Sequence, residues 1–115
     1  MRILVCGDRN WNDQVRITSR LAKLGHGHVI VHGAARGADT MAGVAASSLD
    51  MSVDVYPADW NKFGRSAGPI RNRQMLDTKP DLVIAFHPNI EASKGTKDCV
   101  NEARRRGIPV EVITG

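Results

Sequence analysis

The stretch Gly33-Ala34-Ala35-Arg36-Gly37-Ala38-Asp39 decides how this chain is expected to fold. It follows a short apolar run at 28–32 and leads into an alanine-rich segment, 38–49, whose small side chains favour a helix packed closely on a sheet. Its two glycines leave backbone N–H groups open between strand and helix, which suits a phosphate-bearing ligand. A tight turn in which Asp39 caps the helix is the alternative. The spacing matches neither a Walker A loop nor a GxGxxG motif.

Three further segments combine a glycine-containing loop with the start of a helical pattern. They are Gly7-Asp8-Arg9, Ala67-Gly68-Pro69-Ile70-Arg71-Asn72 and Ser93-Lys94-Gly95-Thr96. In a parallel α/β sheet, all strand-to-helix turns lie at the carboxyl edge, where ligands bind. We therefore expect the four segments to converge on one pocket that offers backbone N–H groups and basic side chains to a phosphate.

Apolar runs alternate with helical patterns along the whole chain. Strands are expected at 2–6, 28–32, 53–56, 81–87 and 110–113, and helices at about 12–24, 38–49, 69–77 and 96–106. Asn12 is expected to cap the first helix, and Pro69 to open the third. The alternation predicts one Rossmann-like, three-layer α/β/α domain over residues 1–115, with a five-stranded, mainly parallel sheet in the order 3-2-1-4-5.

Composition limits the classes of protein to consider. The 115 residues carry a formal net charge of +4, and no apolar run approaches the length of a membrane span. The apolar start is interrupted at once by Asp8 and Arg9, which argues against a signal peptide. Two separated cysteines outside any CxxC pair fit a reducing compartment, so we expect a cytoplasmic protein without a membrane partner.

Several side chains near these loops suggest ligand contacts. Arg71 is expected in the first turn of its helix, where a cation is unfavourable unless it faces an anion. Trp11 and Trp60 are the two tryptophans, and each could stack on a base or form a hydrophobic lid. His28 and His32 lie about 13 Å apart at strand rise, so they cannot share a metal ion. No metal site and no cofactor is expected.

The candidate ligand-binding residues lie in or beside the four loops. They are Gly7, Asp8, Arg9, Gly33, Ala34, Arg36, Gly37, Asp39, Trp60, Gly68, Arg71, Asn72, Lys94, Gly95 and Thr96.

In their order and spacing, these segments resemble the SLOG superfamily, in particular its small YspA/YpsA-like branch. The resemblance rests on 7–9, 33–39, 57–60, 67–72 with Met75, and 95–96. It implies a domain that binds a nucleotide or nucleotide-derived ligand, as a sensor, carrier or sequestering module. The superfamily includes the LOG cytokinin-activating phosphoribohydrolases and the DprA-type single-strand DNA binders. Proteins with this fold often associate, which implies a homo-oligomer.

The chain departs from the LOG pattern where that pattern carries its chemistry. Arg71 matches the LOG arginine, but Asn72 stands in the place of the following lysine. Gly95 and Thr96 match the Gly-Thr turn, but Cys99 occupies the position of the glutamate. The resemblance thus favours binding over the first alternative, a phosphoribohydrolase that cleaves an N-glycosidic bond. Candidate acids for such an enzyme are Asp8, Asp39, Asp59 and Glu91.

A single-stranded nucleic-acid binder is the second alternative. The positive net charge and the basic run 104–106 are compatible with nucleic acid. Aromatic residues make up only 4% of the chain, however, which leaves few platforms on which bases could stack. The basic run also suits the solvated C-terminal end of a helix, where cations complement the helix dipole.

Overall fold

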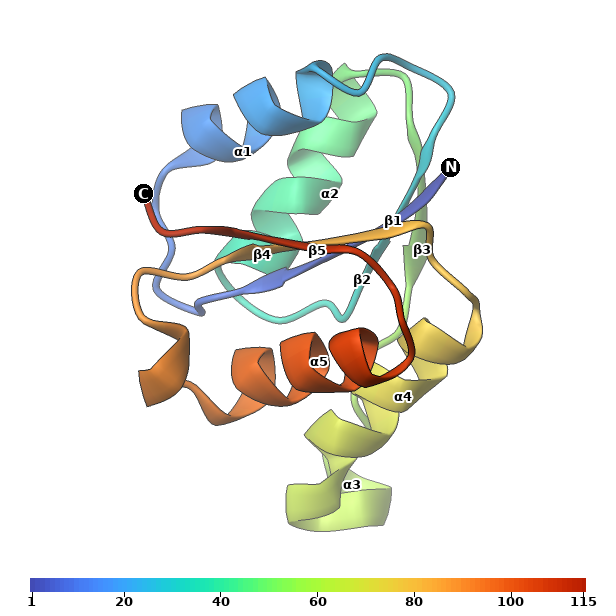
Figure 1. Cartoon of the computed structure of the whole chain (residues 1–115), viewed down its shortest axis with the longest axis vertical. Coiled ribbons are helices and arrows are strands. Elements are labelled where there is room, and N and C mark those ends of the chain that lie inside the picture. The colour runs from blue at the N-terminus through green and yellow to red at the C-terminus, as the bar shows by residue number, and fades with distance from the viewer.

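The computed structural model describes residues 1–115, with a five-stranded sheet between two layers of helices (Figure 1). The strands lie in the order β3-β2-β1-β4-β5, and every neighbouring pair is parallel. Their bounds are β1 Arg2–Gly7, β2 Val29–His32, β3 Ser52–Val55, β4 Leu82–Phe86 and β5 Val110–Ile113. The predicted Rossmann-like class and strand order are confirmed.

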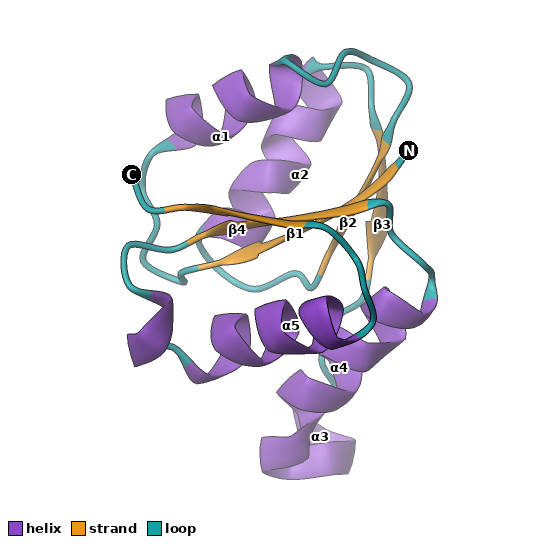
Figure 2. Ribbon diagram, viewed as in Figure 1, coloured by secondary structure: helices purple, strands orange, loops and turns teal.

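Helices α1 and α2 cover one face of the sheet, and α4 and α5 cover the other (Figure 2). The helices are α1 Gln14–Ala22, α2 Ala38–Ser48, α3 Trp60–Phe63, α4 Ala67–Asp77 and α5 Lys94–Arg105, with 3-10 turns η1 Gly64–Ser66 and η2 Ile90–Ala92. None of them has the length and apolar character needed to cross a membrane.

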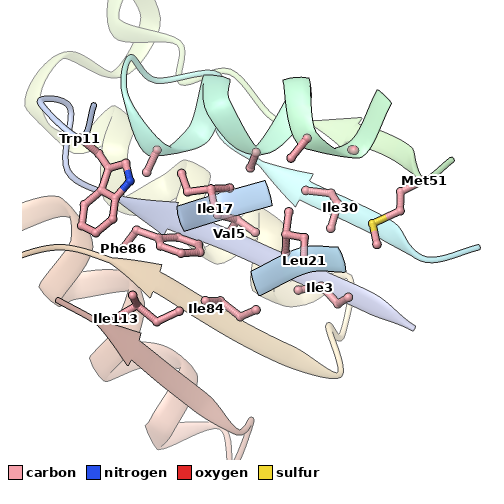
Figure 3. Packing of buried hydrophobic residues seen from close by; sticks show 14 residues of the cluster. Ile3, Val5, Trp11, Ile17, Leu21, Ile30, Met51, Ile84, Phe86 and Ile113 are labelled. Atoms are coloured by element: carbon pink, nitrogen blue, oxygen red, sulfur yellow. The ribbon is translucent and has the colours of Figure 1, made fainter. Parts of the chain in front are cut away.

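Each face of the sheet has its own hydrophobic core, because side chains alternate along a strand. On β1, Ile3 and Val5 point towards α1 and α2, whereas Leu4 and Cys6 belong to the core under α4 and α5. Figure 3 shows the first of these cores, in which Ile17 and Leu21 and other apolar side chains pack together. Four alanines of α2 are fully buried there, which lets this helix approach the sheet closely.

Two features between the strands differ from the prediction. Asp13, rather than Asn12, caps α1, because its carboxylate accepts the N–H of Arg16. The segment after β3, expected as a loop, contains the short helix α3. Asp59 caps α3 by accepting the N–H of Lys62. Asp59 is thereby committed to a local structural role.

Helix α4 also begins earlier than predicted. It starts at Ala67, so Pro69 is its third residue rather than its first. Arg71 is then the fifth residue and lies beyond the first turn, where the helix dipole no longer acts strongly on it. The dipole-based expectation that Arg71 must face an anion is therefore wrong in its premise, and the role of this residue follows from its contacts.

Candidate ligand-binding cavity

A cavity of about 820 Å³ lies at the carboxyl edge of the sheet, where the loops after β1, β2, β3 and β4 meet α4 and α5. All but two of the predicted ligand-binding residues line it. These are Gly7, Asp8, Arg9, Gly33, Ala34, Arg36, Asp39, Trp60, Arg71, Asn72, Lys94, Gly95 and Thr96. The structure thus brings the four segments together as expected, with 67–72 inside α4 rather than in a loop, and ligand binding by these residues stays a prediction.

Gly37 and Gly68, the two remaining predicted residues, do not line the cavity but shape its wall. Gly37 has a φ of +73°, and a side chain there would clash with the carbonyl oxygens of Asp8 and Arg9. Gly68 is buried beside Trp60, whose ring lies 3.5 Å from the position that a Cβ would take. Position 37 therefore needs glycine for close packing, whereas a Cβ at position 68 would make an ordinary van der Waals contact with the Trp60 ring.

The cavity has further lining residues that were not among the predicted ligand contacts. They are Cys6, Asn10, Ala35, Pro57, Ala58, Met75, His87, Ala92 and Ser93. Several of them are adjacent in sequence to predicted residues and therefore line the same wall. Cys6 gave no such signal, because it belongs to a buried strand and reaches the cavity only at its floor.

Asp39 organises the loop after β2 from within the first turn of α2. Its carboxylate accepts the N–H groups of Gly33 at 2.9 Å and Ala35 at 3.4 Å. Burial raises the pKa of Asp39 to about 6, although the Arg71 cation and the two N–H donors act in the opposite direction. The N-cap position itself is occupied by Gly37, so the alternative of Asp39 as the cap is wrong. Asp39 instead holds the loop in shape.

Arg71 crosses the cavity from α4 to the same loop. Its Nη1 donates to the Gly33 carbonyl at 2.7 Å, and its Nε donates to the Asn72 side-chain oxygen at 3.1 Å. Any side chain at position 33 would collide with the guanidinium. A larger residue at this position would therefore displace the Arg71 guanidinium from its hydrogen bond to the carbonyl of residue 33.

Asn72 connects α4 to the start of α5. Its amide nitrogen donates to the Gly95 carbonyl at 3.2 Å and to the Asp98 carboxylate at 3.0 Å. Asn72 is only 4% exposed, so these contacts satisfy a buried polar group. The residue that replaces the LOG lysine thus positions the first turn of α5 against the cavity.

The N-terminus of α5 forms part of the cavity wall. The helix begins at Lys94 rather than at Thr96, because the Ser93 hydroxyl caps it by accepting the Thr96 N–H at 3.1 Å. The N–H groups of Lys94 and Gly95 then belong to the first turn, where they have no acceptor within the helix. Open space surrounds Gly95 where a side chain would stand, so an anion can approach this backbone.

Four cations on the cavity wall form no ion pair, and one of them, Arg71, is already engaged by its hydrogen bonds to Gly33 and Asn72. Arg9, Arg36 and Lys94 are exposed and take part in none of the ion pairs of the chain. They come from the loops after β1 and β2 and from the start of α5. The cavity is therefore rich in cationic groups that remain available to a ligand.

The two tryptophans have different environments. Trp11 is 8% exposed, meets Phe86 edge-on at 5.5 Å between ring centroids, and donates its indole N–H to the Asp13 carbonyl. Trp60 is 51% exposed and lines the cavity. Of the two predicted stacking residues, Trp60 alone lines this cavity.

The two histidines at the ends of strands, His32 and His87, also lie in different environments. His87 lines the cavity, whereas His32 is buried beside Gly43 and accepts the Ala34 N–H on its Nδ1. Burial lowers the pKa of His32, which favours the neutral ring needed for that acceptor role. No group of three His, Cys, Asp or Glu side chains in residues 1–115 has an arrangement that could hold a metal ion.

The candidate catalytic acids are only partly in the cavity. Asp8 and Asp39 line it, but Asp59 and Glu91 do not, and Glu91 pairs with Lys97 at 2.7 Å. Cys99, at the position of the LOG glutamate, is fully buried in the core under α4 and α5. A carboxylate placed there would face apolar neighbours rather than a ligand.

The basic run 104–106 lies at the C-terminal end of α5, away from the cavity. Arg105 and Arg106 both pair with Glu102, and Arg106 also pairs with Asp77 at 2.8 Å. These ion pairs take up most of the positive charge of the run, so it offers little to a nucleic-acid backbone.

The parallel sheet and the cavity at its carboxyl edge place the chain among Rossmann-like α/β proteins. A family model described as "YspA, cpYpsA-related SLOG family" matches residues 1–63, from β1 through α3. The chain belongs to this family. It is also 36% identical over 118 residues to the Gene 61 protein of Mycobacterium phage D29, in an alignment that covers 95% of this chain and 93% of that protein. No solved structure matches the chain significantly.

Proposed function

We propose that this protein binds a nucleotide or a nucleotide-derived ligand in the cavity and acts as a sensor, carrier or sequestering module. The observation that carries the proposal is the convergence of unpaired cations and open backbone N–H groups from separate loops on one cavity of about 820 Å³. This volume lies within the range of small-molecule sites. Membership of the SLOG family supports a nucleotide-related ligand.

Two different parts of the cavity wall suit the two ends of a nucleotide, the phosphate and the base. The first turn of α5, with Lys94 and the open backbone of Gly95, offers N–H donors and a charge to a phosphate. The exposed indole of Trp60 offers an apolar face on which a base can stack. The cavity thus contains a group for each part of the ligand.

Binding without cleavage fits the contacts better than N-glycosidic hydrolysis. Stabilising the positive charge that builds up on a ribose requires a carboxylate placed at the reacting carbon. Cys99 is in the core, and the two candidate acids that line the cavity are engaged by backbone N–H groups, Asp39 by two of its own loop and Asp8 by that of Asn10. We therefore assign binding rather than turnover to the cavity.

Native mass spectrometry of the purified protein tests the proposal by detecting a co-purified nucleotide. Tryptophan fluorescence provides a second test, because Trp11 is enclosed in the core while Trp60 lies at the cavity. We expect nucleotides to change the wild-type emission in a saturable manner, and Trp60→Phe to abolish the change while retaining the Trp11 signal. If no nucleotide co-purifies and calorimetry detects no binding of any nucleotide, the proposal is wrong.

A further inference from the structure

We propose that Asp39 and Arg71 form a subsite for a hydroxyl group of the ligand's sugar, so that the cavity selects ribonucleotides over nucleotides that lack this hydroxyl. This inference rests on the proposed function and specifies the class of ligand. It follows from an acceptor atom on Asp39 and a donor atom on Arg71, neither of which has a hydrogen-bond partner in the protein, although both residues line the cavity.

One oxygen of the Asp39 carboxylate has no hydrogen-bond partner. Its Oδ2 accepts the N–H groups of Gly33 and Ala35, and its Oδ1 accepts none. In residues 1–115, Arg2 Nε is the one side-chain nitrogen or oxygen that is fully enclosed without a partner, so Asp39 Oδ1 still reaches open space. Asp39 is only 5% exposed and lines the cavity, and the opening at Oδ1 therefore leads into the cavity. A donor on the ligand would satisfy this nearly buried acceptor.

The Arg71 guanidinium also keeps a free donor. Its Nη1 and Nε donate to the Gly33 carbonyl and to the Asn72 side chain, whereas its Nη2 has no partner in the protein. This nitrogen is not enclosed either, because Arg71 is half-buried and Nη2 is not among the enclosed atoms without a partner. Since Arg71 lines the cavity, its remaining N–H groups are available to a ligand there.

Gly33 holds the acidic and the basic side chain near each other. Its N–H donates to Asp39 at 2.9 Å, and its carbonyl accepts from Arg71 at 2.7 Å. Asp39 and Arg71 nevertheless form no ion pair with each other. The two groups are therefore fixed on one residue without direct contact, which leaves the free acceptor and the free donor for a group of the ligand.

A hydroxyl is the ligand group that suits this pair. It donates its proton to the carboxylate oxygen and accepts from the guanidinium on its own oxygen. A phosphate only accepts and is repelled by the Asp39 carboxylate, and an exocyclic amino group of a base only donates. The edge of a base that carries an N–H beside a carbonyl could also do both. The proposed function places the base on Trp60, however, so we assign the subsite to the 2′- or 3′-hydroxyl of a ribose.

Calorimetry with the wild-type protein compares ribonucleoside 5′-monophosphates of all four bases with their 2′-deoxy, 3′-deoxy and 2′,3′-dideoxy counterparts. For each base that binds, we expect the dideoxy nucleotide to bind roughly ten- to hundredfold more weakly than the ribonucleotide, the effect of losing one hydrogen bond to a charged carboxylate. One of the two monodeoxy analogues should show the same loss and thereby identify the hydroxyl. This comparison needs no substitution, so it does not depend on the folding of a variant.

Asp39→Asn should remove most of this preference for the ribonucleotide. The variant keeps an oxygen for the Gly33 N–H but presents an amide NH₂ in place of the free carboxylate oxygen, and this group cannot accept from a hydroxyl. Asp13→Asn is the matched control. It makes the same change outside the cavity, in a carboxylate that also accepts a backbone N–H, that of Arg16, and it should keep the full preference.

Equal binding of a ribonucleotide and its dideoxy counterpart would overturn the inference and leave the proposed function intact. A preference that Asp39→Asn retains in full would also overturn it, because another residue would then bind the hydroxyl. If no sugar preference exists and Asp39→Asn changes which base binds best, the subsite takes the edge of a base instead. If no nucleotide of any series binds, the proposed function fails as well.

Discussion

Arg71 is the residue through which the loop after β2 and the ionisation of Asp39 are coupled. Its positive charge lowers the pKa of Asp39, which burial otherwise raises to about 6. Arg71→Ala should therefore raise the pKa of Asp39 further, as measured by carbon NMR titration of the carboxyl group. Arg73→Ala is the matched control, because Arg73 lies on the same helix but pairs with Asp98 at 3.2 Å. An unchanged Asp39 pKa in Arg71→Ala would show that the two side chains do not interact electrostatically.

Substitutions of Cys99 test whether a side chain at the position of the LOG glutamate can face a ligand. Its side chain is fully buried among apolar residues, and a hydrogen bond to Cys99, together with burial, raises the pKa of the Cys6 thiol. Cys99→Glu should destabilise the protein by more than about 2 kcal/mol in urea unfolding, because it buries a carboxyl group without a partner. Cys99→Ala, which buries no polar group, should lower the free energy of unfolding by less than Cys99→Glu does.

The same position predicts the outcome of an activity assay. We expect weak or absent release of free base from adenosine monophosphate by the wild-type protein, and no gain from Cys99→Glu, because Cys99 lies in the core and does not line the cavity. Strong base release by the wild-type protein that Arg71→Ala abolishes would instead favour the phosphoribohydrolase alternative.

At the scale of elements, the start of α5 depends on a side chain of α4. Asn72→Ala removes the donor to the Gly95 carbonyl and to Asp98 and should loosen the first turn of α5. Losing buried hydrogen bonds of this kind should speed amide exchange in that turn roughly tenfold or more. Hydrogen exchange measured by NMR at Lys97 and Asp98 provides the test. Gln74→Ala, an exposed change on the same helix, should leave these rates unaltered, and equal rates in Asn72→Ala would contradict the proposed anchor.

The sequence predicted the strands and their order well because strands and turns leave strong local signals. The apolar runs and the glycines that end helices placed all five strands within one or two residues. Helix starts were predicted less well, because several polar residues compete to cap them. Ser93 and Asp13 cap their helices where other nearby residues were expected to begin them. The short helix α3 buries no residue, so no apolar periodicity marked it.

The positions of the cavity residues were predictable from topology, but their contacts were not. Parallel strands bring their following loops to one edge, and this alone placed the four segments together. Whether Asp39 caps a helix or holds a loop, and whether Trp11 lies in the core or at the cavity, depends on packing between distant segments. Such packing leaves no mark in the local sequence.

At the scale of the whole molecule, two carboxyl groups make stability depend on pH in opposite directions. Hydrogen bonds from Arg105 and Arg106 lower the pKa of Glu102 from 4.5 to about 2. The contribution of Glu102 to the free energy of unfolding is therefore complete above pH 4.5 and is lost as the pH falls towards about 2. Asp39 behaves in the reverse way. Its pKa is raised from 3.8 to about 6, so the unfolded chain releases the proton first and stability falls as pH rises through this window.

Asp39→Asn separates these two effects, since the amide does not titrate but keeps an oxygen that can accept the Gly33 N–H. Urea unfolding of both proteins gives the wild-type free energy of unfolding minus that of the variant at each pH. This difference should fall by roughly 2 to 3 kcal/mol between about pH 3.5 and about pH 7, since a pKa shift of one unit corresponds to about 1.4 kcal/mol. Glu102 titrates in both proteins, so its contribution cancels. A difference that stays constant, or rises with pH, would mean that Asp39 is ionised in the folded protein at no cost, and the buried wall of the cavity would then be more polar than its packing indicates.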